Sequence, residues 1–129
     1  MKGVIWFRTD LRIDDNPALR SALDNCEEVI GIYIFSQLQW KSHNESNVKL
    51  EFLIKNLFLL EKSLSKLNIP LITIKTESFD SLPKDLSSFV VSNKVGQIFW
   101  NNEFGVNESK RDLLSCTMLE KENVKISRF

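Results

Sequence analysis

One apolar run constrains the fold of this chain more than any other feature. It is VIGIYIF, residues 29–35, an almost unbroken series of apolar residues rich in branched side chains. Such a run is typical of a strand that is covered on both faces within a parallel sheet. We therefore expect a central or near-central strand here, with helices on both sides of the sheet.

Four further segments are expected to be strands of the same sheet, and helical patterns lie between them. These segments are residues 4–7, 71–74, 97–100 and 124–129. Strands that alternate with helices indicate right-handed crossovers and hence a parallel sheet. The sequence therefore predicts an α/β fold. We adopt the strand order 3-2-1-4-5 as a hypothesis, which places the first strand at the centre.

Asn16 and Pro17 predict where the first helix begins. An asparagine side chain caps a helix well, and proline suits the first turn because its missing N–H needs no partner there. A second helix is expected over residues 48–67, where leucines recur at alternating steps of three and four. We expect this helix to face the core. A coiled coil is the alternative, which the wide apolar face and the short repeat disfavour.

Two more helices are expected in the second half of the chain. One lies near residues 82–93, with Phe89 and Val90 facing the core. The other is expected to be capped by Asn107. Its inward side is predicted to carry Leu113, Leu114 and Thr117.

The composition limits the functions open to the chain. Its 129 residues fit one domain, and 17 basic residues balance 17 acidic ones, which argues against a broad electrostatic surface for nucleic acid. Two cysteines and one histidine show no metal-site spacing, and the four glycines form no G-x-G-x-x-G motif for a dinucleotide. The spacing of these residues leads us to expect no metal. The sequence shows no secretion signal and no membrane-spanning run, and we therefore expect a cytoplasmic protein with no membrane partner.

The strand order predicts where a ligand would bind. In an open parallel sheet, ligands bind outside the carboxyl ends of the strands, where the order reverses. Arg8 and Asp10 follow the first strand, Trp40 and His43 follow the second, and residues 101–108 follow the fourth. With the first strand at the centre, these loops converge on one crevice.

The alternating charges of Arg8, Asp10 and Arg12 permit two interpretations. They could bind a phosphate or take part in catalysis, or they could form mutual ion pairs that hold the turn together. We favour the mutual ion pairs. The tryptophans are expected in the core or at the rim of the pocket: Trp6, Trp40 and Trp100.

Three blocks of the sequence resemble the DNA photolyase and cryptochrome family. WFRTDLRIDDNPAL, residues 6–19, matches the opening W-F-R-x-D-L-R-x-x-D-N-x-A-L throughout. The block around Trp40 and His43 is similar to the loop after the second strand in bacterial cyclobutane pyrimidine dimer photolyases that use folate. VNESKRD, residues 106–112, resembles their V-N-E-x-x-R-D segment.

This resemblance implies a fold, a function and partners. Residues 1–129 would be the amino-terminal antenna-binding domain of a deoxyribodipyrimidine photolyase, with a Rossmann-like five-stranded parallel sheet. The domain would hold a light-harvesting methenyltetrahydrofolate, although a flavin or a deazaflavin also remains open. FAD and damaged DNA would bind through a helical domain that this chain lacks, so the chain alone is expected to be inactive and to have no catalytic residue.

The resemblance also assigns the candidate site residues. His43, Asn107 and Glu108 match positions that contact the folate in that subfamily. A carboxylate and an amide could pair with the pterin edge, while an imidazole could stack on it or donate a hydrogen bond. From the residues alone, Asn107 could be only a helix cap and Glu108 only a complement to the helix dipole. The alternative function is a non-enzymatic cryptochrome-type signalling or nucleotide-binding module on the same fold.

Overall fold

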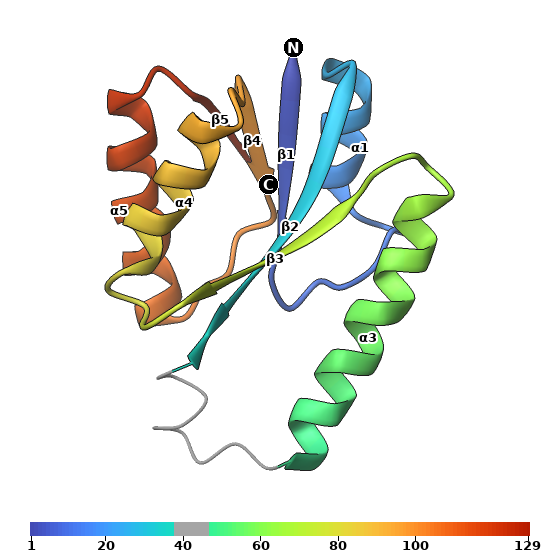
Figure 1. The fold of residues 1–129 in the computed structure, drawn as a ribbon. Helices are drawn as coiled ribbons and strands as arrows, with labels where there is room; N and C mark the ends of the chain where they lie inside the picture. Colours follow the sequence, from blue (N-terminus) through green and yellow to red (C-terminus); the bar gives the residue numbers. More distant parts are fainter. Residues whose placement is uncertain (38–46) are drawn as a thin grey trace.

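The computed structural model describes residues 1–37 and 47–129 of the chain (Figure 1). Strands and helices alternate along these residues. In chain order they are β1 (Lys2–Phe7), α1 (Pro17–Asn25), β2 (Glu28–Ser36), α3 (Asn47–Ser65), β3 (Leu71–Thr76), α4 (Leu82–Ser92), β4 (Gln97–Trp100), α5 (Val106–Lys121) and β5 (Lys125–Arg128).

The strands form one parallel sheet in the order β3-β2-β1-β4-β5. β1 lies at the centre, where Val4 is in register with Ile30 of β2 on one side and with Ile98 of β4 on the other. The predicted α/β class and the hypothetical strand order are both confirmed. The order reverses at β1, and the carboxyl ends of β1, β2 and β4 therefore meet at one edge.

Helices cover both faces of the sheet, with α1 and α3 on one side and α4 and α5 on the other (Figure 1). Alternate residues of a strand point to opposite faces, and each face therefore has its own core. The core beneath α4 and α5 includes Trp6, Ile32, Leu86, Ile98 and Trp100. The core beneath α1 and α3 includes Ile5, Phe7, Leu19, Leu64 and Phe99.

The start of α1 follows the prediction. The Asn16 side chain accepts a hydrogen bond from the Leu19 backbone N–H at 3.1 Å, and Pro17 occupies the first turn. Asn16 is buried, and its amide also donates to the Arg12 carbonyl at 3.0 Å. The cap therefore fixes the loop between β1 and α1 as well as the helix.

The packing of α3 is narrower than its leucine pattern predicts. Leu60 and Leu64 are its buried residues, whereas Leu57 is half-buried and Leu59 is 50% exposed. The helix ends at Ser65, two residues before the predicted end. The expectation of a core-facing helix therefore holds for the C-terminal part of α3, which carries the buried leucines.

The helix that follows β4 differs from the prediction in its cap and in its inward side. Its N-cap is Gly105, and Asn107 lies within the first turn. The buried residues of α5 are Arg111, Asp112, Ser115 and Leu119, whereas the residues predicted to face inward, Leu113, Leu114 and Thr117, are exposed. The prediction was wrong because the helix turns two charged side chains inward, where they pair with charged partners from other segments.

Candidate functional site

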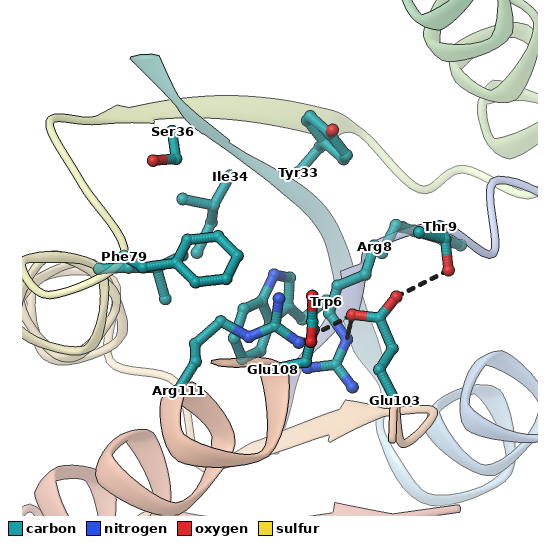
Figure 2. Close-up of a pocket in the computed structure, with 12 residues that line it drawn as sticks. Trp6, Arg8, Thr9, Tyr33, Ile34, Ser36, Phe79, Glu103, Glu108 and Arg111 are labelled. Carbon is teal, nitrogen blue, oxygen red and sulfur yellow. Dashed lines mark hydrogen bonds and ion pairs between the residues drawn. The ribbon is translucent and has the colours of Figure 1, made fainter. Parts of the chain in front are cut away.

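A cavity of about 200 Å³ opens at the carboxyl edge of the sheet (Figure 2). β1 and the residues after it contribute Trp6, Phe7, Arg8 and Thr9, and β2 contributes Tyr33, Ile34 and Ser36. The remaining lining residues are Phe79 and Leu82 near the start of α4, and Glu103, Glu108 and Arg111 at the start of α5. The ends of β1 and β2 and the segment after β4 meet here as predicted, and a further contribution comes from the connection between β3 and α4. The predicted contribution of Trp40 and His43 lies outside the described residues.

Two arginines flank the indole ring of Trp6 in the cavity wall. The guanidinium carbon of Arg8 lies 4.6 Å from the ring centroid, and that of Arg111 lies 5.0 Å from it. Trp6 in turn packs edge-on against Trp100, with ring centroids 5.3 Å apart and an interplanar angle of 79°. Both tryptophans are buried, as predicted. The cation–π contacts favour this arrangement because the ring faces carry negative charge density.

Two carboxylates balance the two arginines. Arg8 Nη1 donates to Asp112 Oδ1 at 2.5 Å, and Arg111 Nε donates to the same oxygen at 3.0 Å. Arg111 Nη2 donates to Glu103 Oε1 at 2.8 Å. Buried charges are tolerated when they are paired in this way. The network joins the end of β1 to α5 and to the connection between β4 and α5.

These contacts overturn the predicted mutual pairing of Arg8, Asp10 and Arg12. Among the described residues no ion pair joins the three, and Arg8 reaches Asp112 instead. The Asp10 carboxylate accepts from the Arg8 backbone N–H at 2.9 Å and from Asn101 Nδ2 at 2.5 Å, while Arg12 donates to the Asp15 carbonyl. The guanidinium groups of Arg8 and Arg12 donate to acceptors other than Asp10, so hydrogen bonds and not mutual ion pairs hold the turn.

The charged network changes the pKa of its members. Burial alone would raise the pKa of Glu103, but hydrogen bonds from Arg111 and Thr9 and the charge of Arg8 outweigh it, so the pKa lies below its ordinary value. Burial, together with the nearby charge of Arg111, lowers the pKa of Arg8. Burial and the negative charge of Glu103 raise the pKa of Tyr33 to about 12.

Some polar atoms in the cavity wall have no hydrogen-bond partner within the described parts of the chain. Ser36 Oγ is one such buried atom. Arg8 Nε is another, because its distance of 3.8 Å from Glu103 Oε1 allows an ion pair but is too long for a hydrogen bond. Buried polar groups are usually hydrogen-bonded, and an unpartnered one in a cavity wall is suited to a ligand. The wall thus offers a hydroxyl, guanidinium donors and carboxylate acceptors beside the rings of Trp6 and Phe79.

The predicted site residues have different outcomes. Glu108 lines the cavity, and its carboxylate folds back over Gly105 into the space that a Cβ would take there. Asn107 is exposed and is not among the lining residues. His43 lies outside the described residues, as does Trp40, and its role stays a prediction.

Sequence reasoning did not single out several residues of the cavity. Glu103 lies in the loop expected to contribute, but nothing in its local sequence distinguishes it from its neighbours. Tyr33 lies within the apolar run of β2 and Ser36 follows it, and their position near the carboxyl end of a strand beside the centre of the sheet is the signal that could have identified them. Within the described ranges we find no cluster of possible metal ligands, and no helix there is long and apolar enough to span a membrane.

Comparison with known proteins identifies the family. A family profile described as DNA photolyase matches residues 3–129. The deoxyribodipyrimidine photo-lyase of Buchnera aphidicola subsp. Acyrthosiphon pisum is 36% identical over 129 residues, which are 99% of this chain and 27% of that protein. The Escherichia coli photo-lyase is 33% identical over 111 residues, which are 85% of this chain and 24% of that protein. This chain thus spans about a quarter of the length of these relatives.

A solved structure agrees with this match. The crystal structure of an archaeal photolyase from Sulfolobus tokodaii, described with two FAD molecules, is 27% identical to this chain with a TM-score of 0.86, and the match covers 100% of this chain and 29% of that one. The profile covers nearly all the residues, and the predicted resemblance is confirmed at the level of the family. The chain belongs to the DNA photolyase family, of which it is the N-terminal α/β domain.

Proposed function

We propose that the cavity at the carboxyl edge of the sheet holds the light-harvesting chromophore of a deoxyribodipyrimidine photolyase, which repairs pyrimidine dimers in DNA with light. The observation that carries the proposal is the cavity wall itself. It combines the half-buried ring of Phe79 with charged donors and acceptors and with the Ser36 hydroxyl, which has no hydrogen-bond partner among the described residues. A planar heterocycle needs apolar contact for its faces and hydrogen bonds at its edge, and this wall supplies both.

The size of the cavity supports a partly enclosed ligand. Its volume of about 200 Å³ is below the roughly 300–1,000 Å³ of a typical small-molecule site. One ring system would lie within it, and the rest of the chromophore would extend past Glu108 toward the exposed Asn107. Arg8 and Arg111, fixed by Asp112, would donate to carbonyl oxygens of the ring edge, and Glu108 would accept from its N–H groups. The role of this domain is to hold the chromophore in a fixed orientation.

The proposed chromophore is methenyltetrahydrofolate, contacted by Glu108, Asn107 and His43. This assignment rests on the resemblance of the VNESKRD segment to folate-using photolyases. Of the two candidates that the structure describes, Glu108 lines the cavity and Asn107 does not. FAD is the second candidate. It is favoured by the likeness to the archaeal photolyase, whose description names two FAD molecules and a novel light-harvesting cofactor.

The activity of the longer protein is part of the proposal. Its other partners would be a helical FAD-binding domain and, through that domain, damaged DNA. The alternative is a cryptochrome-type signalling protein, because Cryptochrome-1 of Arabidopsis thaliana is 30% identical over 98% of this chain. An assay of pyrimidine-dimer repair under light by the longest natural product of this gene separates the two functions, since a signalling protein would leave the dimers intact.

The chromophore is identified by purifying that longest product and recording the absorbance of the cofactors released on denaturation. A folate spectrum beside FAD supports the first candidate, and more than one FAD per chain supports the second. The double variant His43→Ala/Glu108→Ala should lose the antenna while retaining FAD in the helical domain. Antenna content equal to that of the wild type would show that these residues are wrongly assigned.

A further inference from the structure

Asn101 is the first residue after β4, and it bonds both to the connection between β1 and α1 and to the start of α1. Its side-chain amide donates to Asp10 Oδ2 at 2.5 Å and to Asn16 Oδ1 at 2.8 Å. Its side-chain oxygen accepts from the Ala18 backbone N–H at 3.1 Å, and its backbone carbonyl accepts from Arg8 Nη2. These bonds join the end of β4 to the segment that carries Arg8.

Asn101 holds Arg8 at its backbone and at its guanidinium. The Asp10 carboxylate, which accepts from the Asn101 side chain, also accepts from the Arg8 backbone N–H at 2.9 Å. The Asn101 carbonyl holds Arg8 Nη2, while Asp112 holds Nη1. A guanidinium is planar, so two fixed nitrogens determine the direction of its remaining N–H groups. The position of Asn101 therefore sets where those remaining donors of Arg8 point.

Arg8 belongs to the cavity wall, whereas Asn101 lies behind it. The guanidinium carbon of Arg8 lies 4.6 Å from the Trp6 ring centroid, and its Nε lies 3.8 Å from Glu103 Oε1 (Figure 2). Arg8 is among the residues that line the cavity, and Asn101 is not. An effect of Asn101 on a ligand in the cavity must therefore pass through Arg8.

We infer that Asn101 is a positioning residue for the chromophore, because it orients the Arg8 guanidinium toward the acceptors at the chromophore's edge. The inference rests on the proposed function, which puts the chromophore beside Arg8. A donor that is fixed before binding loses little conformational freedom when the ligand arrives. Removing the Asn101 side chain leaves the Arg8 charge and its pair with Asp112 in place, but it frees the backbone carbonyl that fixes the plane of the guanidinium.

The first test is an absorbance titration with methenyltetrahydrofolate of the longest natural product of this gene, stripped of its antenna. Asn101→Ala should weaken binding roughly 2- to 10-fold, the cost of ordering one long side chain on binding. The matched variant Asn16→Ala removes a helix cap and a partner of Asn101 but keeps the link through Asp10, so its affinity should equal that of the wild type. Both variants should lower the unfolding temperature, and affinity thus separates positioning from stability.

A double variant shows whether Asn101 acts through Arg8. Arg8→Lys replaces the planar group with an ammonium on a flexible stem. Asn101→Ala should therefore cause no further loss of affinity in that background. An equal loss in both backgrounds would overturn the inference, because Asn101 would then support only the fold. Wild-type affinity in the single variant Asn101→Ala would overturn it as well.

The orientation of Arg8 is also measured without a chromophore, by nuclear magnetic resonance of the stripped product with isotope-labelled arginine. The Nε–H signal of Arg8 is the one that Arg8→Lys removes. In the wild type this proton should exchange with water more slowly than that of the exposed Arg20, and Asn101→Ala should speed its exchange whereas Asn16→Ala should not. Exchange as fast as that of Arg20 in the wild type, or unchanged in Asn101→Ala, would overturn the inference.

The two measurements distinguish this inference from the proposed function. Faster exchange in Asn101→Ala without antenna binding by the wild type leaves the positioning of Arg8 standing and contradicts the proposed function. A bound antenna together with unchanged exchange does the reverse.

Discussion

Arg8 Nη1 lies 2.5 Å from Asp112 Oδ1, and this ion pair joins residues that are 104 positions apart in the chain. The same Asp112 oxygen accepts from Arg111 Nε. One buried carboxylate thus holds both guanidinium groups that flank Trp6. It connects the central strand of the sheet to α5, and the cavity wall depends on it.

Replacing Asp112 should therefore destabilise the domain strongly. Asp112→Asn nearly conserves volume but removes the negative charge that two buried guanidinium groups share, which we expect to cost about 3–5 kcal/mol. The free energy of unfolding from urea denaturation measures the effect. The matched change Asp24→Asn, at an exposed position on α1, should alter stability by less than about 0.5 kcal/mol. Equal effects of the two changes would contradict the role given to Asp112.

Tyr33 offers a spectroscopic test of the cavity, because it is the only tyrosine in the sequence. Its phenol should ionise with a pKa of about 12 in the folded protein, against about 10 for an ordinary tyrosine. The unfolded chain loses this proton first, so the stability of the fold should fall as the pH rises from about 10 toward 12. Phenolate absorbance during an alkaline titration reports the value.

The neighbouring carboxylate provides the control for that titration. Because the negative charge of Glu103 contributes to the raised pKa of Tyr33, Glu103→Gln should shift the titration to lower pH. Glu61→Gln, an exposed change on α3, should leave it in place. A Tyr33 that titrates at the ordinary value in the folded wild type would show that the half-buried ring is more open to water than the structure has it.

The packing of α3 predicts a sharp contrast between two leucines. Leu64 is fully buried against the sheet, and Leu64→Ala should cost about 2–5 kcal/mol through lost burial and the cavity left behind. Leu59 is 50% exposed, and Leu59→Ala should change the unfolding free energy by less than about 0.5 kcal/mol. Thermal or urea unfolding of the two variants decides the point. Similar losses would mean that the whole leucine face of α3 is buried.

Much of the fold could be predicted because the strands are short apolar runs separated by helices. The VIGIYIF run forms most of β2, which lies beside the central strand β1. The observed strand order agrees with the hypothesised order 3-2-1-4-5. The inward side of α5 could not be predicted in the same way. Apolar spacing identified Leu113 and Leu114, but the helix is oriented by Arg111 and Asp112, whose partners are distant in sequence.

The site was predictable in its location and only partly in its residues. The topological argument placed it at the carboxyl edge of the sheet, and the family resemblance pointed to Glu108, which lines the cavity. Glu103 and Ser36 were missed because their roles depend on contacts between segments that a single sequence does not reveal. For His43, which lies outside the described residues, the family resemblance remains the sole argument.

The central claim is that the cavity beside Glu108 holds the light-harvesting chromophore. Its most direct test is the affinity for the antenna in the longest natural product of this gene, measured by absorbance titration after the antenna has been removed. Glu108→Gln should weaken binding by ~10-fold or more, as expected for loss of a hydrogen bond to a charged group, and Glu120→Gln, at an exposed position of the same helix, should have no effect. Equal affinities for the wild type and both variants would contradict the claim.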